Sequence, residues 1–173
     1  AANVAIGYQA GLAITTGVQN TIMGGHAGDA LTTGSSNVAI GHNALSTEDT
    51  HGRNVAIGLD TLKVQNAGAD AYNTAVGYKA GEAVTSGSLN TLIGGQAGDA
   101  LTVGNNNTAI GYGCLGNETK GDRNVAIGVN TLLNQNNTSS VDSYNVAMGY
   151  GAGQAMTTGT HNTLIGGLAG DAQ

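Results

Sequence analysis

The sequence predicts an all-β protein, a parallel β-solenoid (β-roll or β-helix) of ten roughly 17-residue coils stacked into a rod. Three observations predict it: an asparagine-led phrase recurs at a near-constant spacing, its apolar runs are too short for helices, and glycine recurs throughout. The ten phrases start at Asn3, Asn20, Asn37, Asn54, Asn73, Asn90, Asn107, Asn124, Asn145 and Asn162. The spacing is 17 residues except for 19 after Asn54 and 21 after Asn124, which is typical of stacked repeats with insertions.

The first half of each coil is predicted to be a short strand. In NVAIGYQAG, which starts at Asn3, the run VAI is rich in β-branched residues and is bounded by Asn and Gly. Val4 and Ile6 would share the face that fills the inside of the coil, and Ala5 would point outward. The third position is apolar in every coil, so an apolar stripe would run along the rod. A soluble monomer rarely exposes such a stripe, which predicts a homotrimer around a common axis, unless a wider single-chain coil encloses both faces.

The second half of each coil, such as ALTT or AVTS, is predicted to form a second short strand after a bend. Threonines recur in it, at Thr15, Thr16, Thr32, Thr33, Thr85, Thr102, Thr157 and Thr158. A regular threonine array on a flat β-solenoid can match ice, so an ice-binding protein is an alternative function. Coils 3, 4, 7 and 8 interrupt this array with charges and insertions.

Two columns of identical residues are predicted to be structural. The asparagines at position one would form a ladder in which each side-chain amide bonds the Asn above and below. The glycines at position five, from Gly7 to Gly166, would occupy backbone sites that need positive φ or leave no room for a Cβ.

A longer period of four coils divides the single predicted domain, 1–173, into blocks 3–72, 73–144 and a partial block 145–173. Insertions at 63–72 and 133–144 must bulge from the rod, and loops on a rigid scaffold commonly carry recognition. The candidate receptor contacts are Tyr72, Tyr144, Arg53 and Arg123. Alternatively each tyrosine only pins its loop to the rod, and each arginine pairs with Glu48 or Glu118.

Composition argues against several function classes. The formal charge is −6 and the five Lys and Arg residues are scattered, which disfavours nucleic acid as a partner. No apolar run is long enough for a membrane span. Asp29, Asp99 and Asp171 lie four coils apart and are expected to accept hydrogen bonds from turn amides, and Cys114 is expected to be a packing residue. We therefore expect no catalytic residues, no metal site and no cofactor.

The repeats NTAVGYKAG at Asn73 and NTAIGYGCL at Asn107 resemble the N-T-A-[VI]-G-Y-x-A repeats of phage tail-fibre and similar surface proteins, often found upstream of a self-cleaving intramolecular chaperone domain. The phrase NVAIG is also similar to the head repeats of trimeric autotransporter adhesins, whose repeat unit is shorter. This resemblance implies an extracellular, non-enzymatic shaft segment of a trimeric fibre, on a phage tail or a bacterial surface. The implied partners are other copies of the chain and a cell-surface glycan or receptor. A pure spacer is the remaining alternative, and we expect further repeats or a cap to adjoin the segment.

Overall fold

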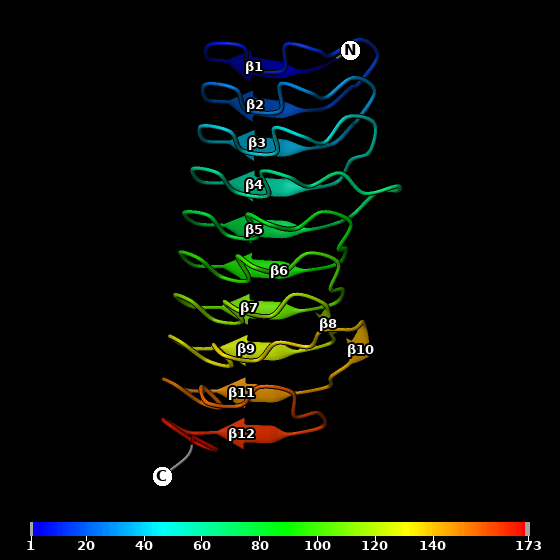
Figure 1. Ribbon diagram of the computed structural model, residues 1–173. Helices are drawn as coiled ribbons and strands as arrows, with labels where there is room; N and C mark the ends of the chain where they lie inside the picture. The colour runs from blue at the N-terminus through cyan, green and yellow to red at the C-terminus, as the bar shows by residue number, and fades with distance from the viewer. Residues whose placement is uncertain (1, 172–173) are drawn as a thin grey trace.

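The computed structural model describes residues 2–171, which form a rod of stacked coils, each of which contributes one strand to a common sheet (Figure 1). Ten three-residue strands make one parallel sheet whose order follows the chain: β1 (Val4–Ile6), β2 (Thr21–Met23), β3 (Val38–Ile40), β4 (Val55–Ile57), β5 (Thr74–Val76), β6 (Thr91–Ile93), β7 (Thr108–Ile110), β9 (Val125–Ile127), β11 (Val146–Met148) and β12 (Thr163–Ile165). Equivalent positions face each other across every pair, as where Val38 lies opposite Val55. The predicted β-solenoid is confirmed. Residues 1, 172 and 173 of the predicted domain lie outside the described residues.

The predicted second strand of each coil is wrong for most of the rod. Turns and bends make up the second half of the described coils, except where β8 (Gly121–Asp122) pairs in parallel with β10 (Val141–Asp142). The backbone amides of Thr15 and Thr16 both donate to the carbonyl of Thr32 in the next coil, at 2.9 and 3.3 Å. Because successive amides turn toward one acceptor, the chain curls there and cannot extend.

The interior and exterior faces of the strands are the reverse of the prediction. The third-position residues point inward, and those of coils 2 to 9 are fully buried: Ile22, Ala39, Ala56, Ala75, Leu92, Ala109, Ala126 and Ala147. The second and fourth positions face outward. Among the fourth-position residues, Ile6 and Ile165 at the two ends of the rod are the most exposed. The coil is thin, so its interior takes mostly alanine at this column, while the bulkier Val and Ile stay outside. Successive side chains of a strand point to opposite faces, but both faces are apolar in the sequence, so the pattern did not indicate which of them was inside.

The narrow core is filled in two alternative ways. In coils 1, 2, 5, 6 and 9, position nine is glycine and position twelve is apolar, whereas in coils 3, 4, 7 and 8 position nine is leucine and position twelve is Glu or Gln. A Cβ placed on Gly28 would lie 2.8 Å from the Leu31 side chain, so glycine makes room for the apolar residue three positions later. Where leucine takes position nine instead, it is fully buried, as in Leu45, Leu62, Leu115 and Leu132.

Close approach of the coils explains the fifth-position glycines. Gly7 to Gly166 have φ between 125° and 138°, a conformation that side chains disfavour. A Cβ on Gly111 would also lie 2.4 Å from the carbonyl oxygen of Gly128 in the next coil. Both the positive φ and the lack of room for a Cβ therefore explain this column.

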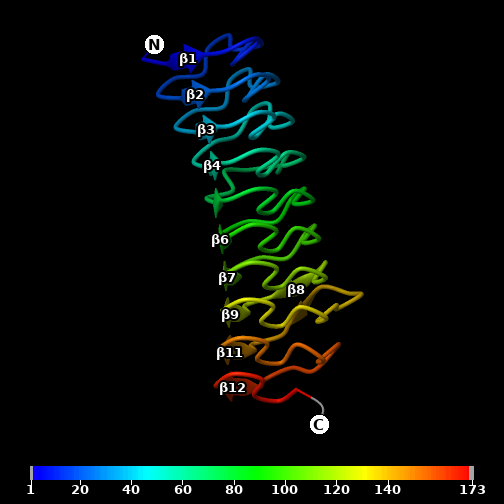
Figure 2. The ribbon, with the colours of Figure 1, turned by 90° about the vertical axis from the view of Figure 1, so that its left-hand side faces the viewer.

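Turned by 90°, the rod shows the sheet along one side and the turns of the second half of each coil on the other (Figure 2).

Candidate functional site

The asparagine column joins successive coils through the backbone as well as through side chains, except between Asn124 and Asn145. The Oδ1 atom of Asn90 accepts a hydrogen bond from the backbone amide of Asn107 at 2.9 Å, and its Nδ2 donates to the carbonyl of Gly104 at 2.9 Å. Side-chain contacts between successive amides are longer, 3.2 Å from Asn107 Nδ2 to Asn90 Oδ1. In this pair the amide oxygen of Asn90 bonds the backbone of the next coil, and its amide nitrogen bonds a backbone carbonyl late in its own coil. This column has a structural role. It is interrupted at Asn124, whose Oδ1 accepts from Gln135 Nε2 at 3.2 Å, and the buried Nδ2 of Asn54 has no partner among the described residues.

The first insertion is tied to the rod by an arginine. Arg53 Nη1 lies 2.8 Å from a carboxylate oxygen of Asp70, and the same nitrogen donates to the hydroxyl of Tyr72. The guanidinium also lies over the Tyr72 ring, 5.3 Å from its centroid. The acidic partner is therefore Asp70 and not Glu48, because Glu48 lies inside the coil with no exposed surface.

The second insertion repeats this arrangement. Arg123 pairs with Asp142 and lies over the ring of Tyr144, 5.5 Å from its centroid. The Tyr144 ring also packs against His161 at 5.3 Å. The partner of Arg123 is again not the glutamate considered from sequence, since Glu118 is buried. In both loops the tyrosine contacts the arginine of the preceding coil, and 48% of Tyr72 and 46% of Tyr144 remain exposed.

Two buried glutamates occupy equivalent positions but have different partners. Glu118 Oε1 accepts backbone hydrogen bonds from Thr119, Lys120, Gly121 and Asn137 at 2.8–3.1 Å, and Oε2 accepts from Asn137 Nδ2 at 2.8 Å. Glu48 Oε1 accepts from the amide of His51 at 3.1 Å, but its Oε2 has no partner among the described residues. Coil 4 has Ala67 where coil 8 has Asn137, so one amide donor is missing. Burial raises the pKa of Glu48.

Two further features could carry chemistry: a group of possible metal ligands and the cysteine, a possible nucleophile. Glu48, Asp49 and His51 bring potential ligand atoms within 4.8 Å of one another, a grouping that was not expected from the sequence. Cys114 is buried, its thiol donates to the carbonyl of Gly111 at 3.0 Å, and burial raises its pKa to about 12. A thiol with this pKa is not a nucleophile at neutral pH.

The three equivalent aspartates do not share one role. Asp171 accepts a hydrogen bond from the backbone amide of Ala155 at 3.2 Å, as predicted for a turn aspartate. The other two contact the side chain three residues earlier: Asp29 lies 3.3 Å from His26 Nδ1, and Asp99 accepts from Gln96 Nε2 at 3.4 Å. Burial raises the pKa of Asp99. These two carboxylates therefore each contact a side chain of their own turn.

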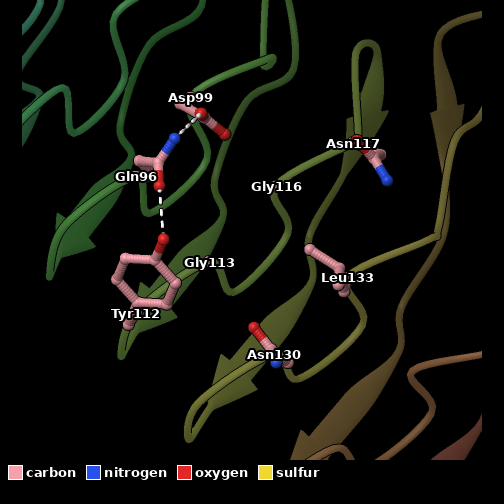
Figure 3. Close-up of a pocket in the computed structure, with 8 residues that line it drawn as sticks. All are labelled: Gln96, Asp99, Tyr112, Gly113, Gly116, Asn117, Asn130 and Leu133. Atoms are coloured by element: carbon pink, nitrogen blue, oxygen red, sulfur yellow. Dashed lines mark hydrogen bonds between the residues drawn. The ribbon is translucent and has the colours of Figure 1, made fainter.

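A depression of about 290 Å³ lies beside Asp99, along the turns that follow β6, β7 and β9 (Figure 3). It is lined by Gln96, Asp99, Tyr112, Gly113, Gly116, Asn117, Asn130 and Leu133. Among the ten coils only coil 7 has glycine at both position seven and position ten, so two side chains are missing from the surface there. This double glycine is the sequence signal that could have located the depression.

The chain matches no protein-family model, no curated protein and no solved structure. The resemblance to tail-fibre and adhesin repeats therefore stays a prediction. No helix among residues 2–171 is long and apolar enough to cross a membrane.

Proposed function

We propose that this chain is a non-enzymatic shaft segment of an elongated homotrimeric fibre or adhesin, displayed outside the cell on a phage tail or a bacterial surface. The observation that carries the proposal is the outward face of the ten-stranded sheet. This face, called the apolar strip below, consists of position two (Val or Thr) and position four (Ile, Val or Met) of every coil. Uninterrupted by any charge, it runs the length of the rod.

The size of the apolar strip favours association along the rod. Ten strands about 4.8 Å apart and three residues of about 3.3 Å each give a strip of roughly 45 by 10 Å, or about 450 Å². The largest apolar patch on a typical soluble monomer covers about 300–600 Å² and is often functional, so the strip is the natural candidate for a contact surface. The strip has two files of side chains, so in a three-fold assembly each file can contact a different neighbour. This replaces the alanine column as the contact surface, because the alanines are buried inside each chain.

The structural features of the rod suit a shaft. Every coil is bonded to the next through the sheet, and most are also bonded through the asparagine column. The glycine column lets the coils approach closely, so stiffness is built into the repeat. The two insertion loops project from one side of such a shaft and offer half-exposed Tyr72 and Tyr144 to a glycan or receptor. The threonines of the alternative ice-binding function lie on turns, and the hydroxyls of Thr32 and Thr102 donate to carbonyls of the next coil, at 3.0 and 2.9 Å.

Sedimentation equilibrium of the purified chain tests the assembly. We expect a mass three times 17.0 kDa for the native chain, and a monomer for Ile110→Lys, which places a charge in the middle of the apolar strip. Leu89→Lys is the matched control, since Leu89 is exposed outside the sheet, and it should remain trimeric. A native chain that is monomeric at all concentrations would refute the homotrimer, and thermal hysteresis in that monomer would favour ice binding.

A glycan array tests whether the loops carry recognition. We expect a bound glycan to be lost when both Tyr72 and Tyr144 are replaced by alanine, with the assembly state unchanged. Retention of binding in that variant would exclude the loops as the contact. Absence of binding by the native chain would favour the spacer role.

A further inference from the structure

We propose that the depression over coil 7 is a binding site for a single neutral hexopyranose ring. It lies at the turns that follow the C-terminal ends of β6, β7 and β9. The insertion loops lie beyond the opposite, N-terminal ends of the strands (Figure 1). The site is distinct from the receptor contacts proposed above. Apart from Leu133, at the start of the second insertion, it uses neither the loops nor the trimer.

The depression exists because coil 7 lacks two side chains that its neighbours have. Coil 6 contributes Gln96 and Asp99 at positions seven and ten, and coil 8 contributes Asn130 and Leu133. At about 30 Å³ each, roughly ten water molecules would fill 290 Å³, which is close to the bulk of one sugar ring of about twelve heavy atoms. The equivalent space in coil 3 is filled by Asn43, whose amide donates to Asp60 at 2.9 Å.

The polar groups around the depression are held in place before any ligand arrives. The Tyr112 hydroxyl donates to Gln96 Oε1 at 2.7 Å, and Gln96 Nε2 in turn donates to Asp99 Oδ2 at 3.4 Å (Figure 3). The Asp99 carboxylate retains acceptor capacity, because its one side-chain contact is long and a carboxylate can accept about four hydrogen bonds. Asn130 faces the floor, with its Oδ1 only 3.0 Å from where a Cβ on Gly113 would lie.

The chemistry of the lining selects a neutral, hydroxyl-rich ligand. The site is lined by one carboxylate and several side-chain amides. No Lys or Arg is among the lining residues, so an anion would meet no counter-charge. Sugar hydroxyls can donate to Asp99 and accept from Asn130, while the C–H face of the ring can pack on Tyr112 and Leu133. A small set of fixed polar groups beside an aromatic and an aliphatic side chain is the usual make-up of a small-molecule site.

Titration of the ¹⁵N-labelled chain with methyl glucoside, galactoside and mannoside tests the site. We expect at least one of them to shift the amides of Gly113, Gly116 and Asn117 with a saturable Kd on the order of 1 mM, typical of a ligand this small. Gly113→Asn should weaken binding at least tenfold by filling the space. It should fold, because Asn43 and Asn130 hold the same left-handed conformation at this position, with φ of 54° and 56°.

Two matched pairs of variants separate recognition from folding. Asp99→Asn and Tyr112→Ala should each weaken binding at least fivefold, whereas Asp29→Asn and Tyr78→Ala, at the equivalent positions of coils 2 and 5, should bind like the native chain. The proposal is overturned if no glycoside gives saturable shifts up to 100 mM, or if Gly113→Asn binds as well as the native chain. It is equally overturned if CaCl₂ shifts these amides and no glycoside does.

Discussion

Replacing Ala67 by asparagine should stabilise the rod, because it supplies the donor that Glu48 lacks. Glu48 Oε2 is buried without a partner, and the equivalent oxygen of Glu118 accepts from Asn137 Nδ2 at 2.8 Å. Ala67 is 5% exposed and stands at the position of Asn137 in the coil. The Ala67→Asn substitution therefore reproduces in coil 4 a contact that the chain already makes in coil 8.

The magnitude follows from the contacts. A hydrogen bond to a charged group contributes about 1.5–3 kcal/mol, and ordering the new side chain costs up to about 1–2 kcal/mol, which leaves a gain of roughly 1 kcal/mol at pH 7. The reciprocal change, Asn137→Ala, removes the donor to Glu118 Oε2 and should cost about 1–3 kcal/mol. Urea unfolding followed by circular dichroism measures both.

The pH dependence gives an independent check. Burial raises the pKa of Glu48 above 4.5, so the folded chain holds its proton to a higher pH than the unfolded chain does. Stability contributed by this group is therefore lost as the pH rises from 4.5 through the raised value, and it is regained on acidification. The new donor favours the ionised form, so Ala67→Asn should flatten this dependence, and Glu48→Gln should remove it. An Ala67→Asn variant with unchanged stability and an unchanged pH slope, together with a harmless Asn137→Ala, would refute the reasoning.

Three further predictions concern the columns and the cysteine. Asn90→Ala removes a partner from the buried amide of Asn107 in the next coil and from the buried carbonyl of Gly104 in its own coil. It should cost about 2–5 kcal/mol in urea unfolding, more than Asn3→Ala at the exposed end, and equal costs would contradict the ladder. Gly111→Ala forces a Cβ against a carbonyl of the next coil and should lower the free energy of unfolding by at least about 3 kcal/mol. Gly68 has open space around it, so Gly68→Ala should change the free energy of unfolding by less than about 0.5 kcal/mol. Because the pKa of Cys114 is raised to about 12, its thiol should react with a disulfide reagent at pH 8 only as fast as the chain unfolds; rapid labelling of the folded chain would disprove its burial.

The repeat architecture was readable from the sequence because stacking imposes one requirement on each column. An asparagine that must serve the coil beside it, and a glycine whose Cβ would collide with that coil, recur at fixed spacing, so the coil number and the insertions could be counted directly. The face of the strand that turns inward was predicted wrongly. Alternation defines two faces, but whether the interior is narrow enough to prefer Ala39 over Val38 depends on the distance between the walls of the coil.

The candidate site was less accessible to sequence reasoning because its parts are not periodic. Arg53 and Arg123 were identified from the sequence, but their acidic partners lie 17 and 19 residues later, in the insertions. The nearby glutamates looked equally suitable in the sequence, and only the structure shows that they are buried. The depression over coil 7 is defined by side chains that are absent at Gly113 and Gly116.

The sequence by itself determined the number of coils, their parallel register and the residues that hold each coil to the next, because a local repeat must satisfy the same contacts every time it is stacked. The tertiary structure alone decided which face is buried, which partners the loop arginines take and where a small ligand has room. These depend on distances across the coil and between neighbouring coils, and no spacing along the chain encodes them.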